Sequence, residues 1–167
     1  MKIKETYFYF LLVICVIIIF IGLNFSMNKS RIKKMSERIE INIDECQIEN
    51  REDSHGGFLG DGEMFSKISC PNIKYEELSS NWKELPLSDS LNEVTHLKQC
   101  IDDGCNDIYE RYLIPTNING YYYFLDRHSD SRDKFDDSEI NIRSSYNFTL
   151  AILEKDTNTI YYYELDT

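Results

Sequence analysis

The sequence of 167 residues contains little glycine and proline, with 7 and 3 residues, so it is neither collagen-like nor of low complexity. It also lacks an excess of basic residues, since 18 Lys and Arg stand against 29 Asp and Glu and the formal net charge is -11. Nucleic-acid binders need clustered basic residues to displace counterions from phosphates, so we expect no nucleic-acid partner. The sequence has no G-x-S-x-G, H-E-x-x-H or P-loop motif either, and this favours a protein that is not an enzyme.

What the sequence does contain is a long uncharged run near its N-terminus, from Thr6 to Asn28. Residues 7–25 of this run, as a helix rising about 1.5 Å per residue, span about 28 Å, close to the bilayer core of about 30 Å. A core helix of a soluble protein is seldom apolar on every face over such a length. We therefore predict a short flank at 1–6 and a transmembrane helix at 7–28, with the lipid bilayer as a partner.

This apolar run differs from a cleaved signal peptide. It is longer than usual and has no A-x-A pattern at its end. Cys15 is preceded by Leu12, Val13 and Ile14, whereas a lipoprotein site has a small residue immediately before its cysteine. The sequence therefore predicts an uncleaved signal-anchor.

A basic segment at 29–38 follows the apolar run, and residues 39–167 carry 11 basic and 27 acidic residues. We expect residues 39–167 to form a single acidic domain, because about 100–200 residues is the usual domain size. The positive-inside rule, applied to 29–38, favours a cytoplasmic domain. The same basic segment can also bind anionic head groups on either side of a membrane.

The cysteines favour the opposite orientation. Beyond Cys15 there are four, an even number that suits an oxidising exterior: Cys46, Cys70, Cys100 and Cys105. We predict the pairs Cys46–Cys70 and Cys100–Cys105, the first joining two predicted strands. Free buried thiols and a zinc site are the alternatives, although no C-x-x-C motif occurs. On this ground we expect the domain to lie outside the cell.

Hydrophobic periodicity predicts an α+β fold, with one mainly antiparallel sheet and one or two short helices against a face. Strands are expected at 39–48, 64–70, 121–126, 146–153 and 160–166, the last two as a hairpin with packed Tyr and Phe. Helices are expected at 74–85, ended by Pro86, and at 106–113, while 88–100 fits either element. Trp82 is expected in the core, and 127–139 as an acidic loop.

Two segments hold candidate functional residues. Asp53, His55, Asp61 and Glu63 lie in a glycine-rich stretch, while Asp126, His128 and Asp130 share one face if they continue a strand. If the segments adjoin, a divalent metal could be held by His55, Asp61, Asp126 and His128. Without a metal, a functional surface would comprise Asp53, His55, Gly56, Gly57, Asp61, Gly62, Arg127 and His128. Turn capping by these Asp, His and Gly residues is the structural alternative.

A calcium site is a further possibility in the same loop. Asp126, His128, Asp130 and Asp137 occupy positions 1, 3, 5 and 12 of an EF-hand-like frame. Position 6 is Ser131 where that frame has glycine, so the match is weak, and a solvated loop is the simpler interpretation. No cofactor is expected other than such a divalent ion.

Four stretches resemble a family of small exported proteins of Gram-positive bacteria whose function is not known. They are DSHGGFLGDGEMF (53–65), LPLSDSL (85–91), NGYYYFLDRHSDS (119–131) and YNFTLAILEKDTNTIYYYELDT (146–167). Members of that family carry a membrane anchor or a lipoprotein signal followed by one compact domain. The resemblance thus implies an exported, membrane-tethered domain, and it implies no catalytic residues.

These features together predict a membrane-anchored domain that acts as a binding or interaction module at the cell surface, with a protein or a cell-envelope component as its partner. A metal-dependent hydrolase using His55 and His128 is the alternative.

Overall fold

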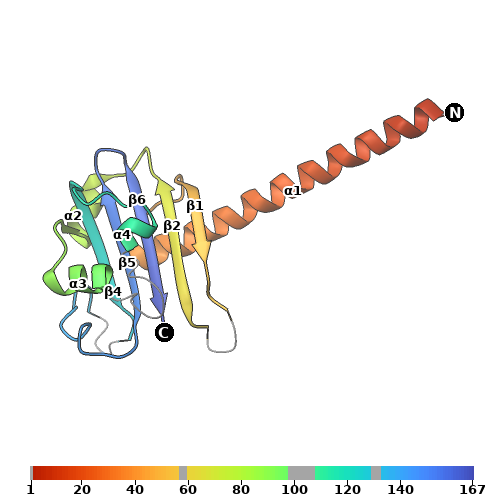
Figure 1. Cartoon of the computed structure of the whole chain (residues 1–167). Helices are drawn as coiled ribbons and strands as arrows, with labels where there is room; N and C mark the ends of the chain where they lie inside the picture. The colour runs from red at the N-terminus through yellow and green to blue at the C-terminus, as the bar shows by residue number, and fades with distance from the viewer. Residues whose placement is uncertain (1, 57–59, 98–107, 129–132) are drawn as a thin grey trace.

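The computed structural model describes residues 2–56, 60–97, 108–128 and 133–167. Over these residues the chain forms a long helix, α1 (Lys2–Ile39), followed by a six-stranded antiparallel sheet with short helices (Figure 1). The α+β fold class predicted from the sequence is therefore confirmed.

The sheet has the strand order β1-β2-β6-β5-β4-β3. Its strands are β1 (Gln47–Asp53), β2 (Gly62–Ser69), β3 (Lys83–Glu84), β4 (Gly120–Asp126), β5 (Asn147–Glu154) and β6 (Thr159–Asp166). The helices after α1 are α2 (Tyr75–Asn81), α3 (Asp89–Leu97) and α4 (Ile108–Arg111). The C-terminal hairpin β5–β6 is formed as predicted, and β6 also pairs along its whole length with β2.

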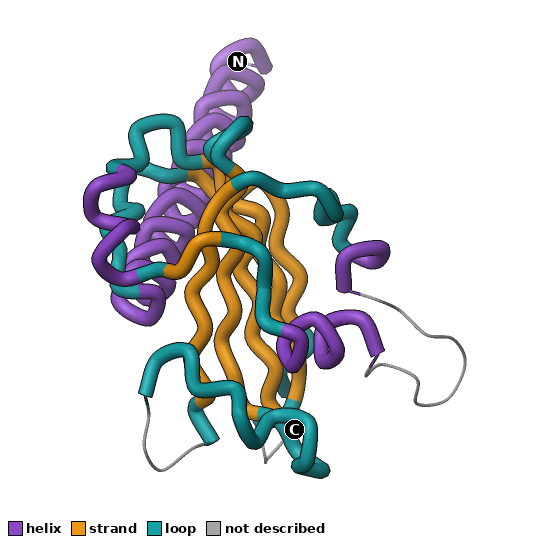
Figure 2. The backbone as a smooth tube through the Cα atoms, turned by 90° about the vertical axis from the view of Figure 1, so that its left-hand side faces the viewer, coloured by secondary structure: helices purple, strands orange, loops and turns teal. Residues whose placement is uncertain are grey.

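Both faces of the sheet are buried, which explains why its strands are apolar at consecutive positions. Along β6, Tyr161 and Tyr163 face one core, while Ile160 and Tyr162 face the other. Figure 2 shows α1 and α2 on one side of the sheet and α3 and α4 on the other. The sequence predicts helices against one face only, whereas the structure has them on both.

The C-terminal part of α1 belongs to the core of the domain. Ile32, Met35 and Ile39, spaced so that they share one helix face, are at most 3% exposed. Lys29 and Lys33 are exposed. The basic segment predicted to separate anchor and domain is thus helical, and it packs on the sheet through its apolar residues.

The strand predicted at 39–48 is wrong. The helix ends at Ile39, and β1 begins only at Gln47. The alternating isoleucines that suggested a strand are buried in a turn: the Ser36 hydroxyl donates to the Ile41 carbonyl at 2.7 Å and accepts from the Ile43 amide at 3.3 Å. Every second side chain of 39–43 is therefore buried, although the backbone of this segment forms no strand of the sheet.

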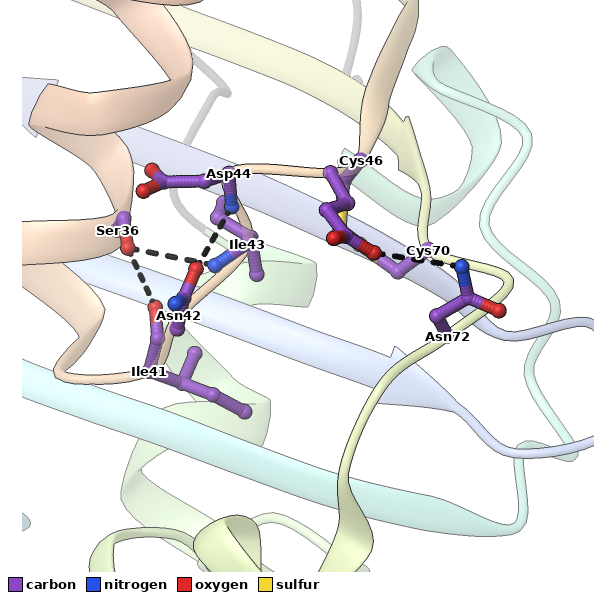
Figure 3. The surroundings of a disulfide bond; sticks show 9 residues. Ser36, Ile41, Asn42, Ile43, Asp44, Cys46, Cys70 and Asn72 are labelled. Atoms are coloured by element: carbon purple, nitrogen blue, oxygen red, sulfur yellow. Dashed lines mark hydrogen bonds between the residues drawn. A yellow bond between two sulfur atoms is a disulfide. The ribbon is translucent and has the colours of Figure 1, made fainter.

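Two contacts hold this end of α1 against the sheet (Figure 3 shows the disulfide). The Trp82 indole donates from Nε1 to the Ile39 carbonyl at 2.9 Å, and Trp82 lies in the core as predicted. Cys46 and Cys70 form a disulfide between the segment before β1 and the end of β2, which confirms this predicted pair. Cys100 and Cys105 lie outside the described residues.

The remaining element predictions differ in extent. The helix expected at 74–85 ends at Asn81, before Pro86, because the chain turns into β3. The ambiguous segment 88–100 contains α3, and the helix expected at 106–113 contains α4.

The N-terminal part of α1 projects away from the domain and is exposed at its apolar residues, including Phe20 and Phe25 at 67% and 73% (Figure 1). From Tyr7 onward this helix is long and apolar enough to cross a membrane.

Candidate functional site

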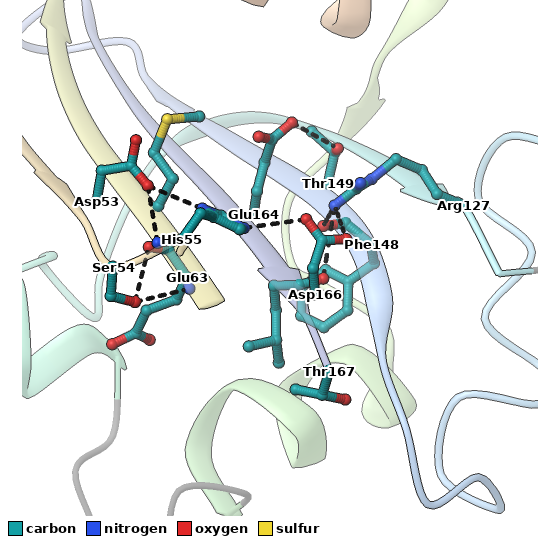
Figure 4. A network of polar contacts seen from close by, with 12 residues as sticks. Asp53, Ser54, His55, Glu63, Arg127, Phe148, Thr149, Glu164, Asp166 and Thr167 are labelled. Carbon is teal, nitrogen blue, oxygen red and sulfur yellow. Dashed lines mark hydrogen bonds and ion pairs between the residues drawn. The ribbon is translucent and has the colours of Figure 1, made fainter. Parts of the chain in front are cut away.

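Two segments singled out in the sequence meet at one end of the sheet (Figure 4). Asp53 ends β1 and His55 follows it, while Arg127 follows directly after β4. Asp166, the last residue of β6, lies between them and contacts both His55 and Arg127. We call these four residues the sheet-end cluster.

His55 is held between two carboxylates. Its Nδ1 lies 2.8 Å from Asp53 Oδ1, and its Nε2 lies 3.0 Å from Asp166 Oδ2. Both carboxylates lie within hydrogen-bond distance of the ring. The imidazole of His55 therefore links the end of β1 to the end of β6.

Arg127 neutralises the second carboxylate from the opposite side. Its Nη2 lies 2.8 Å from Asp166 Oδ1 and donates to the Phe148 carbonyl at 3.0 Å. Its backbone amide donates to the Asn147 carbonyl at 2.7 Å, which continues the β4–β5 pairing by one residue. The guanidinium thus joins β4, β5 and β6 where the sheet ends.

Asp53 is surrounded by donors. Burial by itself raises the pKa of its carboxyl, but the hydrogen bonds from the His55 ring and backbone amide, together with the Arg51 guanidinium, outweigh this and lower the pKa. Asp53 is accordingly ionised at neutral pH, and it acts as an acceptor that orients the imidazole of His55.

The backbone around His55 depends on Gly62. This glycine has φ +155°, and a Cβ atom there would lie 2.6 Å from the backbone nitrogen and Cα of His55. Ser54 locks the same approach, since its amide donates to the Glu63 carbonyl at 2.9 Å and its hydroxyl accepts from the Glu63 amide at 2.9 Å. Gly62 therefore serves the placement of His55, in line with the structural alternative for this glycine.

Other predicted site residues have different surroundings. Asp126 is buried and forms a two-point ion pair with Arg143, whose Nη1 donates to Asp126 Oδ1 at 3.2 Å. The exposed His128 has its Nε2 3.4 Å from the Ser145 hydroxyl. Neither side chain joins the sheet-end cluster through a contact within the described residues.

The metal and calcium hypotheses find no assembled ligand set in the described part of the chain. No group of three or more His, Cys, Asp or Glu side chains there is placed to hold a metal ion. Asp126 is engaged by Arg143, and Asp137 accepts from the Ser88 hydroxyl. Asp61 and Gly56 lie in the β1–β2 connection, joined by a backbone hydrogen bond, while Gly57 and Asp130 fall outside the described residues.

The sequence did not point to Asp166 or to Arg51, which is ion-paired with Asp53. Asp166 is the penultimate residue, and only the pairing of β6 with β2, with Asp166 opposite Gly62, brings it to His55. The hairpin pattern of β5 and β6 does not reveal that neighbour. Arg51 lies two positions before Asp53, and this spacing is the one weak sequence signal that could have identified it.

The sheet-end cluster has acidic and basic side chains at the surface. All four side chains are about a quarter exposed, and Asp166 lies between Arg127 and His55. Such an arrangement suits recognition of a polar or charged partner. No family model matches the chain, and no curated protein or solved structure matches it either.

Proposed function

We propose that the chain is a single-pass membrane protein whose acidic domain lies outside the cell and binds a partner through the sheet-end cluster. The partner would be a protein or cell-envelope component with basic groups on its surface. The observation that carries this proposal is the placement of the cluster relative to the helix. In Figure 1 α1 leaves the domain past the β1 edge of the sheet, whereas the cluster lies at the end of the strands that bears the C-terminus.

The geometry of α1 supports the membrane part of the proposal. Its exposed apolar residues from Tyr7 to Phe25 are suited to lipid, and the next turns enter the core through Ile32 and Met35. The anchor therefore continues into the core of the domain as one helix, and the cluster lies on a different part of the domain from the place where α1 leaves it.

Two further features support the outer location and the kind of partner. The disulfide between Cys46 and Cys70 suits an oxidising compartment. The excess of 27 acidic over 11 basic residues in 39–167 would attract a basic partner and favour its association rate. The resemblance to exported proteins of Gram-positive bacteria agrees with the same location.

Topology can be tested with single cysteines introduced on the two sides of the apolar run of α1. Ile142 is 80% exposed, so Ile142→Cys should react with a membrane-impermeant maleimide in intact cells, above the background of the unsubstituted chain. Lys2→Cys should react only after lysis. The reverse pattern would place the domain in the cytoplasm and overturn the proposal.

Binding can be tested by photo-cross-linking in cells. A photoreactive residue at the exposed position 61, beside the cluster, should capture a defined partner, and Asp166→Asn should reduce the yield about tenfold. The same photoreactive residue at position 113, which is 84% exposed, is the matched control and should not capture that partner. Equal capture from both positions, or no effect of Asp166→Asn, would refute the cluster as the binding surface.

A further inference from the structure

An open groove of about 400 Å³ lies between α1 and the start of β1. Its apolar lining comes from Phe25, Ile32 and Ile48, and its polar lining includes Lys29 and Asp44. The volume falls within the range of about 300–1,000 Å³ typical of small-molecule sites. We call it the helix–strand groove. It shares no residue with the sheet-end cluster, although β1 contributes to both.

The groove lies where the helix passes from apolar to charged residues. The exposed apolar residues of α1 end at Met27, and Lys29 lies four residues after Phe25, about 6 Å further along the helix. The head-group layer on each side of a bilayer core is about 5–8 Å thick. With α1 in a membrane, the groove therefore opens at the level of the phospholipid head groups.

The two charges that line the groove are not satisfied by each other. Lys29 and Asp44 are both exposed, and neither forms an ion pair within the described part of the chain. Opposite charges that share a groove without pairing are complementary to a zwitterion, one group for each end. Asn28 and Gln47 add amide groups to the same lining.

We infer that the helix–strand groove binds a phospholipid whose head group carries a phosphate and a primary ammonium, that is, an ethanolamine phospholipid. The phosphate is held by Lys29 with the neighbouring amides, and the ammonium donates to Asp44. A choline head group has no N–H to donate, and a glycerol head group has no cation for Asp44. Phe25, Ile32 and Ile48 then contact the glycerol and the first carbons of the acyl chains. This inference rests on the proposed membrane anchoring of α1.

The test uses the full chain in detergent micelles that contain equal amounts of phosphatidylethanolamine, phosphatidylcholine and phosphatidylglycerol. Native mass spectrometry measures which lipid stays bound. We expect phosphatidylethanolamine to be retained about tenfold over the other two, the ratio expected for one charge-assisted hydrogen bond. Lys29→Gln should lower retention of all three lipids, whereas Asp44→Asn should remove only the preference for phosphatidylethanolamine.

Matched controls separate the groove from the general basic charge of the helix. Lys34→Gln removes the same charge from an exposed position outside the groove and should leave retention unchanged. Equal retention of the three lipids by the unsubstituted chain, or equal loss in Lys34→Gln and Lys29→Gln, would overturn the inference. Equal binding of soluble glycerophosphoethanolamine, which has no acyl chains, would overturn the assignment to a membrane lipid.

A flotation assay distinguishes failure of the lipid-binding inference from failure of the proposed membrane anchoring. The full chain should float with vesicles and resist alkaline carbonate extraction. A chain that floats and resists extraction but has no lipid preference refutes the groove alone. A chain that does not insert refutes the anchoring, and with it the inference.

Discussion

Both faces of the sheet are covered by helices, but the two cores differ in the side chains that fill them. The face covered by α1 and α2 is mainly aliphatic, with isoleucines from α1, its following turn, β2 and β6. The face covered by α3 and α4 is aromatic, and Phe65 stacks on Tyr112 with ring centroids 4.0 Å apart. The first face also carries a disulfide and the Trp82–Ile39 hydrogen bond. The domain therefore holds the C-terminal part of α1 more firmly than it holds α3 and α4 on the other face.

The largest expected effect is alkaline unfolding, to which both faces contribute. Burial raises the pKa of the Tyr162 hydroxyl on the α1 face and of the Tyr163 hydroxyl on the other, and the nearby Glu164 and Glu63 raise them further. A group with a raised folded pKa stabilises the fold below its unfolded pKa of about 10, and this stability is lost as pH rises above it. We expect about 1.4 kcal/mol per pH step for each of the two tyrosines between pH 10 and 12.

This prediction is checked by following tyrosine ionisation at 295 nm together with circular dichroism. Ionisation of the buried Tyr162 and Tyr163 should coincide with loss of the fold. Full ionisation with the fold intact would contradict it.

The second prediction tests whether α1 is part of the core. Ile39 is fully buried, so Ile39→Ala should reduce the free energy of unfolding by about 3 kcal/mol, as a buried large-to-small change does. Leu91→Ala in α3, at 2% exposure, should cost a similar amount on the other face. Urea unfolding of the full chain in detergent measures both.

The matched control for Ile39→Ala is Ile19→Ala in the same helix, where the side chain is 61% exposed. It should leave domain unfolding unchanged. Equal effects of the two helix substitutions would show that the buried and exposed parts of α1 do not differ as described.

A third experiment removes the cross-link found on the α1 face. Closing the 24-residue separation between Cys46 and Cys70 should stabilise the domain by about 3 kcal/mol. The double variant Cys46→Ser/Cys70→Ser should show this loss, and reducing agent should produce the same loss in the unsubstituted chain. Cys15→Ser, at an exposed position in α1, is the control and should unfold as the unsubstituted chain does.

The smallest expected effect concerns the sheet-end cluster. Because Asp53 has a lowered folded pKa, its contribution is present above the unfolded pKa of about 4 and is lost as pH falls through the folded pKa. Asp53 is partly solvent-exposed, so we expect this to be below about 1 kcal/mol. Asp53→Asn should flatten the loss of stability between about pH 5 and pH 2, measured by urea unfolding.

Much of the fold follows from periodicity, and the exceptions have physical causes. Alternation and turn residues located β4, β5 and β6, because each strand pairs with a neighbour close in sequence. The same alternation misplaced a strand at 39–48, since burial of every second isoleucine also fits a turn packed beneath a helix. The predicted Cys46–Cys70 pair is present, although the strand expected to carry Cys46 begins only at Gln47.

The candidate site was predictable only in part. Asp53, His55 and Arg127 stand out in the sequence as charged residues beside glycines and strand ends. Their meeting depends on Asp166, and the pairing of β6 with β2 joins residues about one hundred positions apart. Local patterns carry no information on such a neighbour. The metal hypothesis failed to gain support for a related reason, because Asp126 is paired with Arg143, seventeen residues away.

The absence of a flexible joint between Phe25 and Ile32 within α1 has a mechanical consequence. If the helix is held by a bilayer, the domain cannot swivel freely, so the sheet-end cluster stays at a nearly constant height above the lipid and at a constant inclination. A partner fixed to the same surface would meet the cluster without either molecule losing much rotational freedom, which lowers the entropy cost of association. Inserting a glycine-rich hinge after Phe25 would vary that height and inclination while leaving every side chain of the cluster in place.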